Sequence, residues 1–182
     1  GEPAFFTNYQ QLYNTWLAEE LRKLPRNRHT CFYATNGGPG PVRPDCSSFM
    51  DYAVHDLAIL NALWSPAELE LTLAAQTADG TSTKIWLGNE DYCLTLTTSN
   101  SAPDKQHMWT ADPVLSVDLR SPQAPSPLHC ALSDWANVAR KLTPPKQWHT
   151  PAFSLPILRW VEQVEGHIVK MRSELREQRR EK

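Results

Sequence analysis

Four segments between residues 68 and 120 alternate apolar and polar residues with the two-residue period of a β-strand. They constrain the fold more than any other feature, because each has one apolar face and short turns separate the first three. This pattern predicts an antiparallel meander with one covered face. The predicted strands span 68–77, 83–88, 92–99 and 113–120, and a longer loop over 100–112 precedes the fourth.

Helical periodicity lies on both sides of these predicted strands. Apolar residues recur at spacings of three and four over 8–24, 47–63 and 128–142, which predicts three amphipathic helices. Glycine and proline fill 36–45, so an irregular loop is expected there. The chain is therefore expected to have an α+β fold, an antiparallel four-stranded meander packed by helices, within a single globular domain over 1–150.

The final segment, 151–182, is predicted to be a C-terminal helix with a heptad pattern, and hence a coiled-coil stalk or partner-binding helix. β-Branched residues at the a positions favour a parallel dimer, in which Glu174 and Arg179 would face opposite charges. Packing of the same apolar face against the chain's own sheet is the open alternative. The apolar residues of this seam are spaced by four and three, and they are Ile157, Val161, Val164, Ile168, Met171 and Leu175.

Charge and cysteine content exclude several function classes. The net charge of −2 gives the whole chain no electrostatic reason to bind nucleic acid or an anionic membrane. The cysteines at 31, 46, 93 and 130 show no metal-ligand spacing, and no cofactor motif is present, so neither a metal nor a cofactor is expected. Reduced cysteines in an intracellular protein are favoured, although two disulfides and secretion stay open.

Cys46 is the candidate nucleophile, because it lies at the start of a predicted helix, where a thiol's pKa falls. The segment Asp45-Cys46-Ser47-Ser48-Phe49, with Tyr52 after it and a Gly-Gly pair before it, resembles the active-site segment of NlpC-type papain-like cysteine peptidases. That resemblance implies a cysteine amidase or peptidase. In the family a histidine begins a strand near a segment like TKIWLGN, but Thr83 and Lys84 hold that place here.

The remaining polar and aromatic residues are assigned to surfaces. The acidic residues, Asp56 among them, form no recognisable acid–base pair and are expected on a charged surface. Trp109 and Trp148, in predicted loops beside His107 and His149, are expected to be the most exposed aromatic contact residues.

The order of elements from residue 47, a helix, four strands, a proline-rich crossover and two helices, is similar to that of RWD-type interaction domains. This resemblance implies binding to other proteins. We therefore expect a non-enzymatic interaction or assembly subunit that associates through the C-terminal helix, as a homodimer or with another protein, and a head-domain surface. The peptidase based on Cys46 is the alternative.

Overall fold

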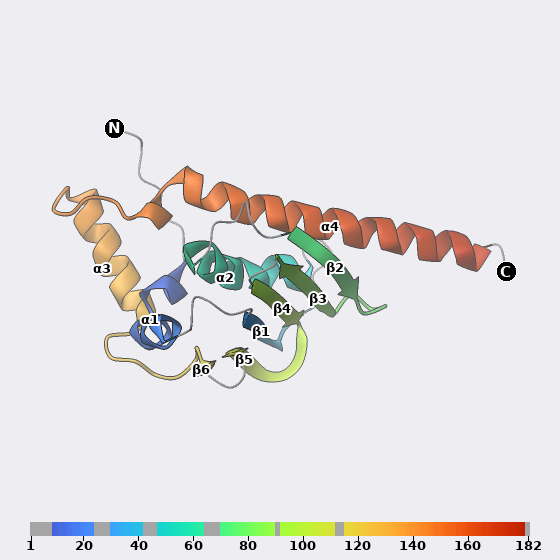
Figure 1. Ribbon diagram of the computed structural model, residues 1–182, viewed down its shortest axis with the longest axis horizontal. Helices are drawn as coiled ribbons and strands as arrows, with labels where there is room; N and C mark the ends of the chain where they lie inside the picture. Colours follow the sequence, from blue (N-terminus) through green and yellow to red (C-terminus); the bar gives the residue numbers. More distant parts are fainter. Residues whose placement is uncertain are drawn as a thin grey trace.

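A computed structural model describes residues 9–23, 30–41, 47–63, 70–89, 92–111 and 115–180. Six strands form one mixed sheet in the order β2-β3-β4-β1-β5-β6, in which β1 and β4 are parallel and the other neighbours are antiparallel (Figure 1). The predicted four-stranded meander is therefore wrong, because two further strands join the sheet. The strands are β1 (Thr30–Pro39), β2 (Glu70–Gln76), β3 (Ser82–Gly88), β4 (Tyr92–Ser99), β5 (Ser101–Ala111) and β6 (Leu115–Asp118).

The two strands that the sequence did not predict lie side by side in the sheet. β1 includes Gly37 and Gly38, in the stretch that was expected to be an irregular loop. A Cβ atom at Gly37 would collide with the carbonyl oxygen of Ser99 on β4, so glycine is required by the close approach of two backbones. β5 replaces the expected loop over 100–112, and its last five residues alternate between buried and half-buried.

Helices α2 and α4 lie on the same side of the sheet, and α4 continues past β2 toward the C-terminus (Figure 1). α1 lies with α3 at the other end of the molecule and contacts β6. Ser126 caps α3 by accepting a hydrogen bond from the His129 backbone. The helices are η1 (Gln10–Tyr13), α1 (Thr15–Arg22), α2 (Ser48–Leu63), α3 (Pro127–Ala139), η3 (Gln147–His149) and α4 (Pro151–Arg180).

The hydrophobic core lies between the sheet and α2 and α4. α2 contributes Phe49, Ala53, Leu57 and Leu60, which recur at helical spacing and are at most 1% exposed. The inward residues of the central strands cover them from the sheet side and are similarly buried; they are Phe32, Ala34, Ile85, Leu87, Leu94, Leu96 and Trp109.

Four of the six heptad-seam residues on α4 belong to this core. Ile157, Val161, Val164 and Ile168 are each no more than 5% exposed and pack with the core residues of the same chain. These side chains therefore pack within the same chain, because α4 contacts α2 and β2. Farther along, Met171 is half-buried and Glu174 is exposed, whereas the side chains of Leu175 and Arg179 lie outside the described part of the structure.

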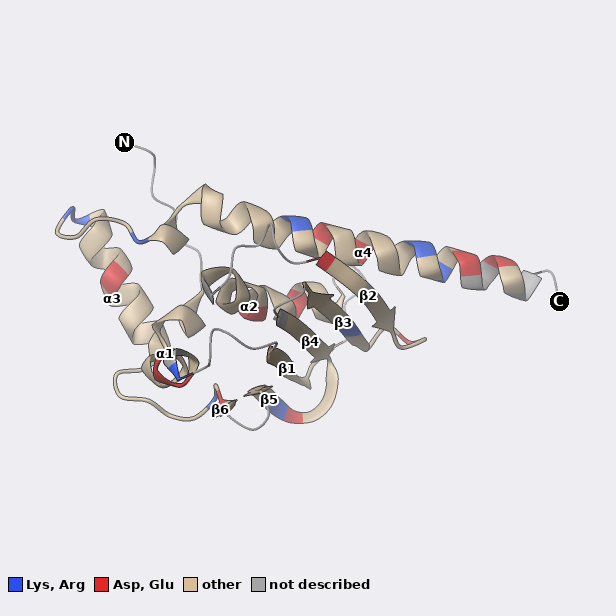
Figure 2. Cartoon of the chain, viewed as in Figure 1, with Lys and Arg blue, Asp and Glu red and all other residues tan. Residues whose placement is uncertain are grey.

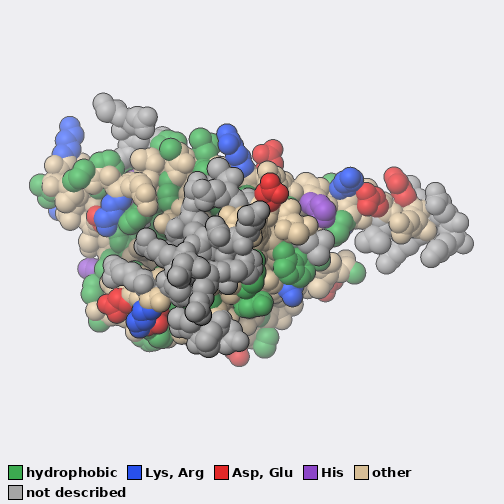
Figure 3. All heavy atoms as spheres, in the orientation of Figure 1, with side chains coloured by type: hydrophobic (Ala, Val, Ile, Leu, Met, Phe, Trp, Pro, Cys, Tyr) green, Lys and Arg blue, Asp and Glu red, His purple; other side chains and the backbone are tan. Residues whose placement is uncertain are grey.

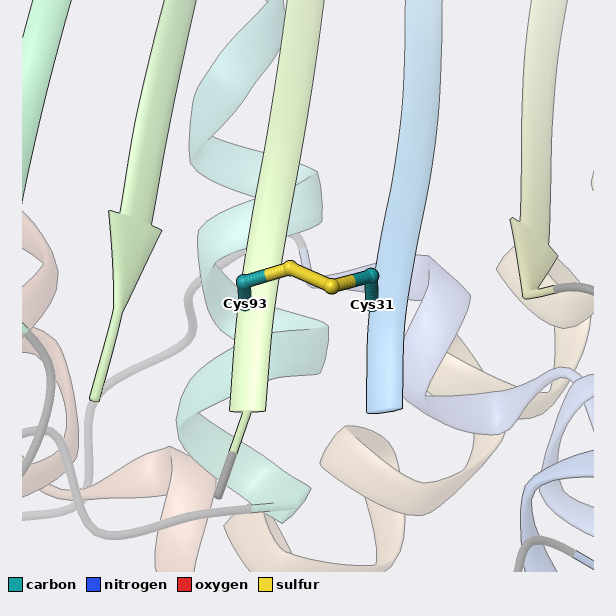
Figure 4. The surroundings of a disulfide bond; sticks show 2 residues. All are labelled: Cys31 and Cys93. Atoms are coloured by element: carbon teal, nitrogen blue, oxygen red, sulfur yellow. A yellow bond between two sulfur atoms is a disulfide. The ribbon is translucent and has the colours of Figure 1, made fainter. Parts of the chain in front are cut away.

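A disulfide joins Cys31 to Cys93 across the parallel strands β1 and β4 (Figure 4). The two residues are register partners, with Cα atoms 4.6 Å apart, and both are half-buried. The expectation of reduced cysteines is therefore wrong for this pair, because parallel pairing of β1 with β4, which the sequence did not predict, brings the two thiols together. Cys130 on α3 is free.

Two glycines in contrasting surroundings provide a test of this fold. Gly80, in the turn between β2 and β3, has φ +75°, and a Cβ there would lie 2.5 Å from Nη2 of Arg172. We expect Gly80→Ala to lower the free energy of unfolding by about 1–2 kcal/mol, chiefly because a left-handed conformation costs an L residue that much. Urea denaturation measures the change.

Gly166→Ala is the matched control. Gly166 is exposed in α4, and apart from the adjacent residues and the backbone of its own helix no atom lies within 4 Å of the position that a Cβ would occupy there. Alanine at this position should therefore raise the free energy of unfolding by up to about 1 kcal/mol. A Gly80→Ala protein as stable as the original would contradict the described turn.

Candidate functional site

The carboxylate of Asp56 forms the centre of a buried polar cluster between α2 and the sheet. Asp56 lies on the inner face of α2 and is fully buried. Its Oδ1 accepts hydrogen bonds from Nε2 of His107 at 2.8 Å and Nε1 of Trp109 at 2.6 Å. Its Oδ2 accepts from Nδ2 of Asn36 at 2.8 Å. A buried carboxylate needs such donors, since an unpaired one would cost several kcal/mol.

Three secondary-structure elements bring these donors together. His107 and Trp109 are two residues apart on β5, so both side chains point to the face covered by α2. Asn36 is the register partner of His107 on β1, and its Nδ2 also donates to the backbone carbonyl of Tyr52 at 3.0 Å. The cluster therefore fixes α2 to both strands, which were expected to be loops at these positions.

His55 adjoins the cluster from the preceding position on α2. It is half-buried, and its Nδ1 is inaccessible and has no hydrogen-bond partner. Burial lowers the pKa of His55 below its ordinary value of 6.5, the nearby Asp56 opposes that decrease, and His107 adds to it. At neutral pH the imidazole is therefore uncharged.

This arrangement suits proton transfer. A neutral imidazole can accept a proton, and a carboxylate beside it stabilises the imidazolium that results. The unpaired ring nitrogen of His55 is shielded from solvent, so a hydroxyl group would reach it only after the neighbouring side chains move. His107 is bonded to Asp56 through Nε2, so only its other ring nitrogen could exchange a proton with a substrate.

The described part of the structure offers neither a metal centre nor a dinucleotide site of the usual kind. Among the described residues, no group of three or more His, Cys, Asp or Glu residues could hold a metal ion. A dinucleotide-binding unit needs several parallel strands and a Gly-x-Gly-x-x-Gly turn. The described sheet has a single parallel pair, β1 with β4, and the sequence has no such glycine motif. These residues do not fit a nicotinamide dinucleotide.

The structure does not bring the residues that were predicted to be functional together in one site. Cys46 lies outside the described residues, and Thr83, at the position where the peptidase base would be expected, is buried and hydrogen-bonded to Ser48. Trp109 is fully buried and Trp148 is half-buried, so the expectation of exposed aromatic contacts is wrong for Trp109. The prediction of partner contacts by the α4 seam is not supported at its four buried positions, and for the later positions it stays a prediction.

The sequence did not identify the cluster because its members are far apart in the chain. Asp56 was assigned to a charged surface, but its position three residues after Ala53 and four before Leu60 places it on the apolar, inner face of α2. An acidic residue on such a face signals a buried polar site. Its partners on β1 and β5 could not be found without knowledge of the strand pairing.

Charges elsewhere on the molecule do not single out another site. Lysine, arginine and acidic residues are interspersed along the exposed side of α4, and no single sign dominates the view (Figure 2). None of the helices within the described ranges is long and apolar enough to cross a membrane.

Comparisons with known proteins identify the fold. No protein-family model matches the sequence, and no curated protein matches it. Solved structures do match. The chain superposes on an oxidoreductase from Magnetospirillum magnetotacticum MS-1 with a TM-score of 0.64 and 18% identity, over 91% of this chain and 63% of that one.

Two further matches are a dehydrogenase and a ketoreductase according to their names. UDP-N-acetylglucosamine 3-dehydrogenase GnnA from Acidithiobacillus ferrooxidans gives a TM-score of 0.65 and 14% identity, over 91% of this chain and 61% of that one. KijD10, a 3-ketoreductase from Actinomadura kijaniata solved with TDP-benzene and NADP, gives a TM-score of 0.57 and 14% identity, over 89% of this chain and 59% of that one. The chain thus spans less than two thirds of the length of these proteins.

These matches correct the predicted family and function. The solved structures that share this fold are an oxidoreductase, dehydrogenases and a ketoreductase by name, not NlpC-type peptidases or RWD-type domains. The expected non-enzymatic interaction subunit is contradicted, since the proteins that share this fold are oxidoreductases and dehydrogenases. The peptidase alternative is unsupported as well.

Proposed function

We propose that this chain is the substrate-side part of an oxidoreductase, in which His55 transfers the proton that leaves a hydroxyl group during its oxidation or joins a ketone oxygen during its reduction. One observation carries the proposal. A neutral histidine with an unpartnered, buried ring nitrogen lies beside a fully buried carboxylate, in a fold shared with a dehydrogenase and a ketoreductase.

Each member of the cluster has a stated role in this proposal. His55 is the proton acceptor or donor, because its Nδ1 has no partner. Asp56 stabilises the imidazolium that forms on His55, as its effect on the pKa of that residue indicates. His107, Trp109 and Asn36 hold the Asp56 carboxylate in place through their hydrogen bonds and are positioning residues.

The proposed substrates are an alcohol or a ketone on a sugar nucleotide, by analogy with a UDP-N-acetylglucosamine 3-dehydrogenase and with a 3-ketoreductase solved with TDP-benzene. The described residues do not fit a dinucleotide, so the proposal assigns the hydride acceptor to residues other than these. Binding to a partner protein or to a second copy stays a prediction, as does the expected absence of binding to nucleic acid or to a membrane.

Intracellular localisation also stays a prediction. The Cys31–Cys93 disulfide is of a kind found mostly in oxidising compartments. Alkylation of free thiols immediately after cell lysis would reveal whether these two cysteines are paired where the protein works.

Replacement of His55 tests the proposed role in the full-length protein that contains this chain. We expect His55→Asn to lower kcat by roughly 10²–10⁴-fold in nicotinamide-dependent turnover of sugar nucleotides, because general acid–base catalysis contributes that much. The measurement is the change in nicotinamide absorbance at neutral pH. Circular dichroism and the melting temperature show whether the variant is folded.

His129→Asn is the matched control, because it removes a histidine that is exposed on α3. It should leave turnover unchanged. Wild-type turnover by His55→Asn would remove His55 from the reaction, whereas absence of turnover in the original protein with every sugar nucleotide tested would contradict the proposed substrate class.

A further inference from the structure

A second polar and aromatic cluster lies at the end of the molecule where η1, α3 and η3 meet, and the proposed reaction does not use it. We propose that this cluster is a binding site for an organic ammonium group, which the chain's own Lys146 occupies. The site consists of the rings of Tyr13 and Trp148 and the carboxylate of Asp134, and is called here the ammonium corner.

The two rings form adjacent walls. Tyr13 and Trp148 have ring centroids 5.6 Å apart and an interplanar angle of 84°. The ammonium nitrogen of Lys146 lies 4.6 Å from the Tyr13 centroid and 5.2 Å from that of Trp148. Both distances are within the range at which a cation is attracted to an aromatic face. A cation between two nearly perpendicular rings is the arrangement that proteins use to recognise ammonium ligands.

Asp134 supplies the opposite charge. Its Oδ2 lies 3.2 Å from the Lys146 nitrogen, and its side chain is 16% exposed. Burial alone would raise the pKa of Asp134, but hydrogen bonds from Tyr13 and Lys146, together with the charges of Lys146 and His149, outweigh it and lower that pKa. The corner is therefore anionic at neutral pH, and without Lys146 it would lack its compensating cation.

The walls are held by bonds that do not involve the lysine side chain. The hydroxyl of Tyr13 donates to Oδ2 of Asp134 at 2.6 Å and accepts from Nε1 of Trp148 at 2.9 Å. The same hydroxyl lies 3.0 Å from Nε2 of His149, which is 1% exposed. Removal of the Lys146 side chain thus leaves the two rings and the carboxylate in position. Because these groups are already held in place, little free energy is spent on ordering them when a ligand binds.

Lys146 is an occupant that can leave. Its side chain is 43% exposed, and every residue from 139 to 147 is exposed. Basic positions are visible along this connection between α3 and α4 (Figure 2), and lysine or arginine side chains project into solvent at this end of the molecule (Figure 3). An ammonium ligand from solution would therefore compete with the side chain of Lys146, which is part of the same chain. The ligand can bind only when this side chain has left the site.

Tetramethylammonium chloride is the probe, with sodium chloride at equal ionic strength as the reference. Binding is followed by the indole N–H resonance of Trp148 and by tryptophan fluorescence. We expect Lys146→Met to bind the probe at least about tenfold more tightly than the original protein, because the internal competitor is gone. Lys146→Gln, which is also neutral, should behave in the same way and carries the test should the methionine variant not fold.

Two matched variants isolate the corner. Lys170→Met removes an exposed lysine from α4 and should bind no more tightly than the original protein. Asp134→Asn in the Lys146→Met background keeps the side-chain shape and should lose at least about tenfold of the gained affinity. Absence of saturable binding in both Lys146 variants, or equal binding with Asp134→Asn, would overturn the proposal.

The ammonium group could belong to a small molecule or to a lysine of another protein. Titration of a peptide with a single trimethylated lysine distinguishes these sources. Equal affinity for the peptide and tetramethylammonium assigns the corner to small ammonium ligands, whereas much tighter binding of the peptide assigns it to a protein side chain.

Discussion

Replacement of Cys31 and Cys93 together by alanine is expected to lower the free energy of unfolding by about 4 kcal/mol. The disulfide joins residues that are 62 positions apart in the sequence. It lowers the conformational entropy of the unfolded chain, and for a loop of this length the resulting stabilisation is about 4 kcal/mol. The bond joins the two central strands of the described sheet, whose pairing is the only parallel one in it. Guanidinium denaturation provides the measurement.

Reductant supplies the control for this experiment. Dithiothreitol should lower the stability of the original protein nearly to that of the double variant and leave the double variant unchanged. A double variant as stable as the oxidised original would show that the disulfide contributes nothing to the folded state. Cys130→Ala, which removes the free thiol on α3, should not abolish the response to reductant.

Asp56→Ala is expected to lower the free energy of unfolding by about 3–5 kcal/mol. The substitution removes the acceptor for His107, Trp109 and Asn36, of which only Asn36 keeps another acceptor, the Tyr52 carbonyl. It also removes the hydrogen bonds by which the Asp56 side chain joins α2 to β1 and β5. Asp56→Asn keeps the shape and one acceptor oxygen, so its cost should be smaller. Chemical denaturation monitored by tryptophan fluorescence gives both values.

Asp104→Ala serves as the matched control, because Asp104 is exposed on β5. Its replacement should change the free energy of unfolding by no more than about 0.5 kcal/mol. A loss of less than about 1 kcal/mol in Asp56→Ala would contradict the buried hydrogen-bond cluster and, with it, the position of His55 beside a carboxylate.

Local periodicity predicted those elements whose apolar residues alternate or recur regularly. The structure has strands at Glu70–Gln76, Ser82–Gly88 and Tyr92–Ser99 and a helix at Ser48–Leu63, close to the ranges expected from the sequence. It has α4 from Pro151 to Arg180, also near its expected start. For these elements the pattern of buried residues and the intrinsic preference of the backbone agree.

Elements whose sequences carry turn signals were missed. β1 contains Asn36-Gly37-Gly38-Pro39, which is typical of a loop, yet the close approach of Ser99 on β4 requires a glycine there. β5 has a proline and two charged residues among its first five, so its strand character is evident only in the His107–Ala111 alternation. Strand pairing between distant segments decides both cases, and local sequence does not contain it.

The candidate site depends on the same long-range pairing. His107 and Asn36 meet only because β1 pairs with β5, and Asp56 reaches them because α2 covers that pair. The heptad pattern could not distinguish packing of α4 within the chain from packing between two chains, because both arrangements bury the same residues. The structure resolves this for Ile157, Val161, Val164 and Ile168 by placing them in the core.

The pH dependence of kcat/KM in the full-length protein tests the role of His55 most directly. Burial lowers the pKa of His55 below 6.5, so the neutral form that accepts a proton persists throughout the neutral range. For alcohol oxidation, kcat/KM should be flat near pH 7 and should decrease as the pH falls through that lowered pKa. In His55→Asn this acid limb should be absent. An acid limb that persists unchanged in His55→Asn would contradict proton transfer by His55.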